Sequence, residues 1–67
     1  MNGLEIYAEA YDLVLGFFEG DKKKTDLWFS TDNPNFGGAS ADRLFEMDRG
    51  HKVLEFIKTS LEENKRE

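Results

Sequence analysis

Apolar residues recur at steps of three and four along most of the 67-residue chain, a period that predicts α-helices. No stretch alternates apolar and polar residues as a half-buried strand would. The pattern therefore predicts an all-α fold, a small four-helix domain with an amphipathic N-terminal helix followed by three shorter helices. The predicted helices run from Leu4 to about Glu19, from Lys22 to Ser30, from Ala41 to Asp48 and from His51 to about Asn64. Residues 1–20 hold the first helix, 21–64 the other three, and 65–67 a frayed tail.

The first predicted helix carries two apolar rows rather than one. The row expected to face the core is Leu4, Ala8, Tyr11, Leu15 and Phe18. Together the two rows cover more than half of the helix circumference, which is more than short neighbouring helices are expected to bury. We therefore expect the second row to form a homodimer or partner interface, the alternative being that the neighbouring helices bury both rows. This second row is Ile6, Ala10, Leu13 and Phe17.

Glycines and capping residues set the predicted helix ends. Gly20 is expected to end the first helix in a left-handed conformation, and Asp21 to cap the second. Ser40 is the predicted cap of the third helix, and Gly50 its left-handed end. The only tryptophan, Trp28, is expected to be the largest anchor of the core rather than a platform for a ligand.

The loop between the second and third helices, "TDNPNFGGAS", concentrates the turn-forming residues. Asn33 and Pro34 predict a turn, and Gly37 and Gly38 supply backbone angles that other residues adopt rarely. Phe36 is expected to point toward Trp28. A phosphate-binding loop would need a lysine after its glycines and a strand before them, and neither is present. The loop is therefore predicted to be a structural corner that binds no ligand.

Composition excludes several classes of protein. The chain has no cysteine and one histidine, so neither a disulfide scaffold nor a structural zinc site is expected. A net charge of −5 disfavours direct nucleic-acid binding, and no apolar run is long enough to cross a membrane. The acidic N-terminal segment is unlike a signal peptide, so a cytoplasmic protein is expected. Domains this small often gain stability by self-association, which favours a homodimer.

No catalytic constellation is recognisable. His51 lies at a helix start with no nucleophile motif beside it, which favours a surface histidine over a general base. The carboxylates are scattered over helix faces. We therefore expect no enzyme activity, no catalytic residue, no cofactor and no metal.

The order of residues in the second half resembles a known family. Read together, these residues resemble the toxin-binding domain of Xre/MbcA/ParS-type antitoxins, whose pattern is a tryptophan, "NP-x-L-G-G-x-S-P", a Leu-rich turn, a glycine and a terminal helix. The resemblance covers Asp21 to about Leu61, with Phe36 in place of leucine and Ala41 in place of proline. The residues that carry it are Trp28, Asn33, Pro34, Phe36, Gly37, Gly38, Ser40 and Gly50.

The resemblance implies an antitoxin of a bacterium or mobile element that binds and inhibits a RES-type, NAD-dependent toxin. Family members usually also carry a helix-turn-helix region, for which we expect no room here. The family's C-terminal end contacts the toxin in some members. On this chain the corresponding candidate contacts are Glu62, Glu63, Lys65 and Arg66.

Three functions remain open from the sequence. The first is a stand-alone, dimeric toxin-binding module. The second is a small dimeric regulatory or mobile-element protein of the same fold with a different protein partner. The third is an enzyme or small-ligand binder that uses Trp28 and the Asn33–Ser40 loop, for which no catalytic group is assignable.

Overall fold

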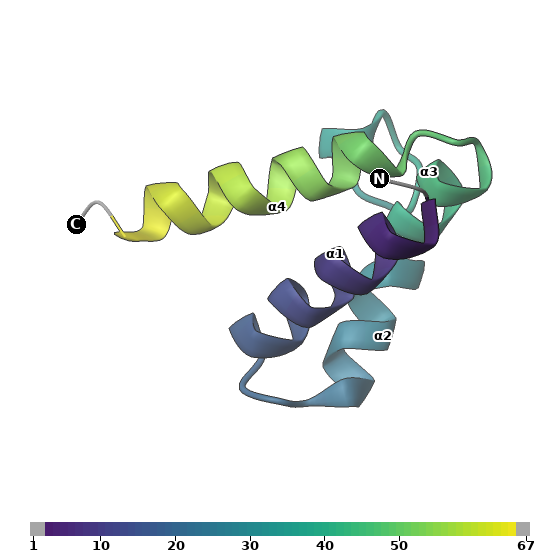
Figure 1. Ribbon diagram of the computed structural model, residues 1–67. Helices are drawn as coiled ribbons and strands as arrows, with labels where there is room; N and C mark the ends of the chain where they lie inside the picture. Colours follow the sequence, from purple (N-terminus) through teal and green to yellow (C-terminus); the bar gives the residue numbers. More distant parts are fainter. Residues whose placement is uncertain (1–2, 66–67) are drawn as a thin grey trace.

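The computed structural model describes residues 3–65, with the side chains of residues 3–63. This part of the chain holds four α-helices and no strand, only a single bridge between Asp32 and Ser40. The predicted all-α fold of four helices is therefore confirmed (Figure 1). The helices are α1 (Gly3–Phe17), α2 (Lys22–Ser30), α3 (Ala41–Glu46) and α4 (Gly50–Lys65), with the one-turn 3₁₀ helix η1 (Pro34–Phe36) between α2 and α3. The expectation that all three later helices are shorter than the first is wrong for α4, which has 16 residues against 15 in α1.

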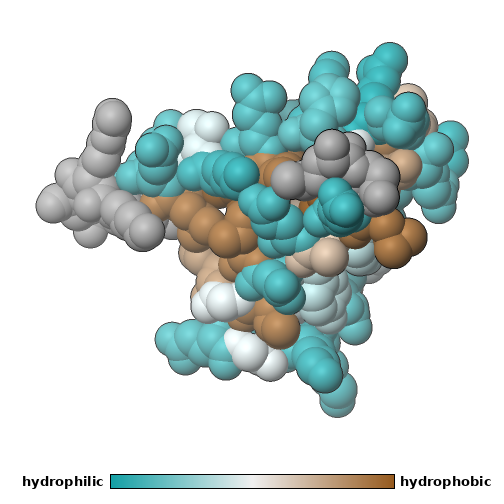
Figure 2. Space-filling view, in the orientation of Figure 1, coloured by the Kyte–Doolittle hydropathy of each residue, from teal (hydrophilic) through white to brown (hydrophobic). Residues whose placement is uncertain are grey.

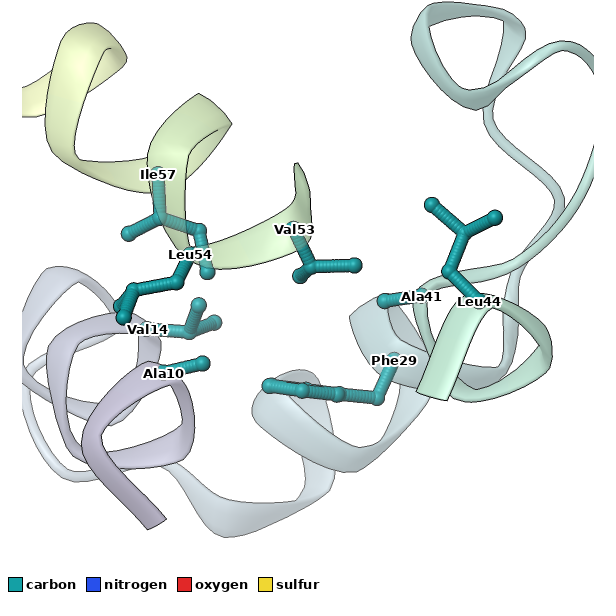
Figure 3. Close-up of a cluster of buried hydrophobic side chains, with 8 residues drawn as sticks. All are labelled: Ala10, Val14, Phe29, Ala41, Leu44, Val53, Leu54 and Ile57. Carbon is teal, nitrogen blue, oxygen red and sulfur yellow. The ribbon is translucent and has the colours of Figure 1, made fainter. Parts of the chain in front are cut away.

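The core draws on all four α-helices and is centred on Phe29 of α2 (Figure 3). Phe29 is the largest fully buried side chain, and its ring lies 5.2 Å from that of Tyr7, 5.6 Å from Tyr11 and 5.0 Å from Trp28. Trp28 itself is only half-buried, so the expectation that it is the largest anchor of the core is wrong. The next residue, Phe29, has that role. Around Phe29 the core consists of Ala10, Val14, Ala41, Leu44, Val53, Leu54 and Ile57.

The buried face of α1 differs from the predicted one. Ala10 and Val14 are buried, whereas Leu4 is 81% exposed and Ala8 is also exposed. The row expected to face the core is therefore partly in solvent, and the second row supplies a core residue instead. The reason is tertiary, because α1 contacts both α2 and α4 and its buried face is the one between them.

The predicted helix caps at Asp21 and Ser40 are confirmed. The Asp21 side chain accepts a hydrogen bond of 3.1 Å from the backbone N–H of Lys24, and Ser40 Oγ accepts one of 3.1 Å from Arg43. Gly20 has a φ of 85°, the left-handed conformation predicted at the end of the first helix. Side-chain caps of this kind satisfy N–H groups that have no partner within the helix.

Gly50 has a different role from the predicted one. It is the buried first residue of α4, and its φ is not positive. The left-handed residue of the α3–α4 turn is Asp48, with a φ of 60°, and α3 ends at Glu46 rather than at Asp48. A Cβ at residue 50 would collide with the ring of Phe45, so glycine is required here for close approach.

We expect Gly50→Ala to destabilise the fold by about 1–3 kcal/mol, because the Phe45 ring must move to admit the methyl group. Gly16→Ala is the matched control, since nothing lies within 4 Å of a Cβ at that helical position. The control should stabilise the chain by ~0.5–1 kcal/mol through helix propensity. Urea unfolding followed by circular dichroism measures both variants, and equal effects of the two substitutions would contradict this role of Gly50.

Candidate functional site

An open apolar groove lies between the C-terminal parts of α1 and α4. The two helices diverge toward their C-terminal ends, and α4 continues beyond the end of α1 (Figure 1). Figure 2 shows apolar atoms exposed in this region, below α4 and beside α1. The space measures about 190 Å³. We call it the α1/α4 groove, and its walls are Leu13, Val14, Phe17, Phe18, Trp28, Phe56, Ile57, Ser60 and Leu61.

The wall on the α1 side ends in two adjacent phenylalanines. The rings of Phe17 and Phe18 lie 5.2 Å apart, nearly perpendicular, and Phe17 is 57% exposed. Directly after them the chain turns through Glu19 and Gly20, both with positive φ. Because the helix stops here and the chain leaves for α2, no described segment continues along α4 beside its last turns. An ion pair of 2.9 Å between Lys58 Nζ and Glu9 Oε2 joins α4 to α1, one turn before the first groove residue of α1.

The opposite wall is supported by a row of aromatic rings. Trp28 meets Phe36 edge-on at 6.2 Å, and Phe36 meets Phe56 of α4 at 5.2 Å. The predicted contact between Phe36 and Trp28 is thus confirmed. Phe36 also contacts Phe56, so the glycine-rich loop packs against a wall residue of the groove on α4.

The loop itself is built as the predicted corner. Asn33 Oδ1 accepts a hydrogen bond of 2.9 Å from the N–H of Asn35, and Pro34 begins η1. Gly37 and Gly38 have φ values of 70° and 89°, the left-handed region that glycine tolerates. These angles return the chain to Ser40, the cap of α3. The loop residues that carry the resemblance therefore have structural roles.

The four predicted interface residues separate into two groups. Leu13 and Phe17 line the α1/α4 groove. Ile6 packs against the core, and Ala10 is fully buried. Ala10 cannot contribute to a surface of the folded chain, so its place in the predicted interface is corrected. The second apolar row of the first helix thus indicated the α1 side of the groove, through Leu13 and Phe17. Ser60 was missed, because a small polar residue among apolar ones gives no such signal.

Glu62 and Glu63, two of the predicted toxin contacts, are exposed near the end of α4. The side chain of Lys65 and all of Arg66 lie outside the described residues, as does most of the predicted frayed tail. Glu62 and Glu63 follow the wall residue Leu61 directly in the sequence.

A second, more polar hollow lies on the other side of Phe56. It measures about 340 Å³ and contains two cationic side chains, Arg49 and Lys52, both exposed. Its remaining walls are Asn35, Phe36, Gly37, Leu44 and Phe56. Exposed cations at the rim of an open hollow are ordinary surface chemistry, so the apolar groove is the stronger candidate site.

The two tyrosines connect α1 to its neighbours through carboxylates. The hydroxyl of Tyr7 donates a hydrogen bond of 3.3 Å to Asp42, and that of Tyr11 donates one of 2.7 Å to Asp26. Burial and the adjacent Asp42 carboxylate raise the pKa of Tyr7, and the hydrogen bond to Asp26 is the main cause that raises the pKa of Tyr11. Both hydroxyls therefore stay protonated at neutral pH and act as structural donors.

His51 is exposed in the first turn of α4. Among the described residues, no three His, Asp or Glu side chains come together in a way that could hold a metal ion. Within the same residues, no helix combines the length and apolar character needed to cross a membrane.

Comparison of the chain with protein-family models, with curated proteins and with solved structures gives no match. Among the described residues, the α1/α4 groove is the strongest candidate site.

The raised tyrosine pKa values predict how stability responds to alkali. A folded-state pKa above the unfolded value of 10.0 means that folding favours the protonated hydroxyl. This contribution is complete below the unfolded pKa and is lost as pH rises through the folded pKa. Titration of tyrosinate absorbance should give a midpoint above 10.0 for the folded chain and near 10.0 in concentrated urea. Tyr7→Phe removes one of the two tyrosines, so the variant reports the Tyr11 transition by itself. A wild-type folded midpoint at or below that in urea would overturn both assignments, and the same result for the variant would overturn that of Tyr11.

Proposed function

We propose that this protein is a non-catalytic protein-interaction module whose contact surface is the α1/α4 groove. The supporting observation is that aromatic and aliphatic side chains from three helices line an open hollow beside a complete core. Contiguous apolar surface of this kind is typical of protein-interaction sites. Phe17, Trp28 and Phe56 belong to the residue types that are enriched in the centres of protein interfaces.

We further propose that the partner is a RES-type, NAD-dependent toxin that the module inhibits by binding. The support is the resemblance of Asp21–Leu61 to the toxin-binding domain of Xre/MbcA/ParS-type antitoxins. The candidate contacts Glu62 and Glu63 follow the groove along α4 and are accessible to such a partner. A cytoplasmic location, a bacterial origin and the absence of direct nucleic-acid binding belong to the same proposal, the last because the chain carries a net charge of −5.

One observation favours a second candidate, a homodimeric regulatory or mobile-element protein of the same fold with another protein partner. The groove takes Leu13, Val14 and Phe17 from α1 and Phe18 from the turn directly after it. This helix lies outside the segment that resembles the antitoxin family, so the α1 side of the groove is independent of that resemblance, whereas Trp28 on the other side belongs to it. A gene without a toxin-encoding neighbour would support this candidate.

Co-expression with a RES-type toxin encoded by an adjacent gene tests the proposal. The wild-type chain should co-purify with the toxin and suppress its NAD-consuming activity. Phe17→Lys should weaken inhibition at least tenfold, because it places a charge in the groove, an effect of ~1.4 kcal/mol or more. Leu27→Lys is the matched control, because Leu27 is 65% exposed on α2 and lines neither hollow.

The control should inhibit like the wild type, with both variants folded by circular dichroism. Inhibition that survives Phe17→Lys would remove the groove from the toxin contact. Failure of the wild-type chain to bind an adjacent toxin would leave the second candidate.

A further inference from the structure

The α1/α4 groove and the second hollow have one wall residue in common. Phe56 of α4 lines both, and its ring lies 5.2 Å from that of Phe36, which lines the second hollow. Phe56 thus separates apolar walls on one side from two cations, Arg49 and Lys52, on the other. We call the second hollow the cationic hollow. A protein segment that binds in the groove and continues past Phe56 along α4 reaches these cations.

Arg49 and Lys52 have no carboxylate partner among the residues whose side chains the structure describes. The ion pairs found there use Arg43 and Lys58 instead. No described carboxylate lines the cationic hollow either, although Asp48 directly precedes Arg49 in the sequence. In a chain with 14 acidic and 9 basic residues, this concentration of unpaired positive charge is a local exception. It is complementary to a negatively charged group that another molecule brings.

We propose that the cationic hollow receives an acidic side chain of the same protein partner whose apolar residue occupies the α1/α4 groove. Arg49 and Lys52 then pair with that carboxylate, and the guanidinium of Arg49 can donate to both of its oxygens. The inference rests on the proposed function, in that it takes the groove to be a protein contact. It adds the chemistry of the partner segment, an apolar residue followed or preceded by Asp or Glu.

The geometry of α4 sets the spacing that the partner segment needs. Lys52 lines the cationic hollow, and Ser60, about two turns later on the same helix, lines the groove. At 1.5 Å of rise per residue, the two positions lie ~12 Å apart along the helix axis. An extended chain covers ~3.3–3.6 Å per residue. The acidic residue is therefore expected about three to four residues from the apolar one.

An acidic protein segment fits the cationic hollow better than a nucleic acid does. Two cations can neutralise one carboxylate, whereas a DNA-binding protein commonly contacts about 6–10 phosphates. The chain as a whole carries a net charge of −5 and therefore repels a phosphate backbone. A single carboxylate needs only the local pair of cations.

Selection from random peptides displayed on phage tests the proposal without a known partner. Peptides of about 12 residues are long enough to span both hollows. Selection against the immobilised wild-type chain should enrich peptides with Asp or Glu about three to four residues from an aromatic or aliphatic residue. Recovery of no binder, or of apolar binders without an enriched acidic residue, overturns the proposal.

Variants then locate the acidic contact with one synthetic peptide from the selection. Arg49→Glu combined with Lys52→Glu should weaken its binding at least fivefold by isothermal titration calorimetry, because both attractions become repulsions. Lys22→Glu combined with Lys23→Glu is the matched control, since it changes the net charge equally at exposed lysines that line neither hollow. The control should weaken binding less than twofold, and an equal loss in both double variants overturns the proposal.

A change in the peptide provides the second half of the test. Converting its acidic residue to the amide should remove the difference between the wild-type chain and the Arg49→Glu, Lys52→Glu variant, as expected for two groups in direct contact. Circular dichroism checks that each variant folds. If this double variant fails to fold, Arg49→Gln combined with Lys52→Gln takes its place. An undiminished difference with the amide peptide overturns the proposal.

The same measurements distinguish this inference from the proposed function. Peptide binding that Phe17→Lys abolishes and Arg49→Glu with Lys52→Glu leaves intact rejects the acidic contact and retains the groove as a protein contact. Binding that is sensitive to both, with no toxin co-purified, supports the acidic contact and rejects the toxin as partner. Micromolar binding of single-stranded DNA, or self-association, that the Arg49→Glu, Lys52→Glu variant abolishes would assign the hollow to another occupant and overturn the proposal.

Discussion

The burial of Phe29 is the contact on which the rest of the structure depends. Two routes of ring contacts lead from it. One passes through Tyr7 to Phe45, whose ring lies against Gly50 at the start of α4. The other passes through Trp28 and Phe36 to Phe56 in the middle of α4. Both routes end on α4, so one buried ring helps to fix the start and the middle of the helix that forms one wall of the groove.

The sequence was sufficient for features set by local chemistry. The caps at Asp21 and Ser40 and the left-handed Gly20 depend on residues within one helical turn, and all three were predicted. Gly50 was misassigned, because its requirement comes from the ring of Phe45, which no local pattern reveals. The rotation of α1 was missed for the same kind of reason. Its periodicity shows two apolar rows but not which one the neighbouring helices cover.

The α1/α4 groove was predicted from the sequence only in part. Leu13 and Phe17 were predicted as surface contacts, because the first helix has more apolar surface than a small core can bury. The contribution of α4 could not be predicted, since it depends on how far α4 diverges from α1 and on where α1 stops. Ser60 becomes a groove residue only through that geometry. It lies in the groove wall, half-buried, with apolar side chains on either side.

Stability and binding are linked in a domain this small. A chain of 60–70 residues buries about 60% of its unfolded surface, and here several large side chains that pack against the core also line an open groove, where Phe17 is mostly exposed. Whatever closes the groove therefore stabilises the fold as well, because a ligand that binds only the native state shifts the folding equilibrium toward it. Replacing Phe17 or Leu61 by a polar residue would make the isolated chain more soluble but would remove part of the proposed contact surface. The exposed apolar groove is thus a cost to the monomer, which a partner bound there would offset.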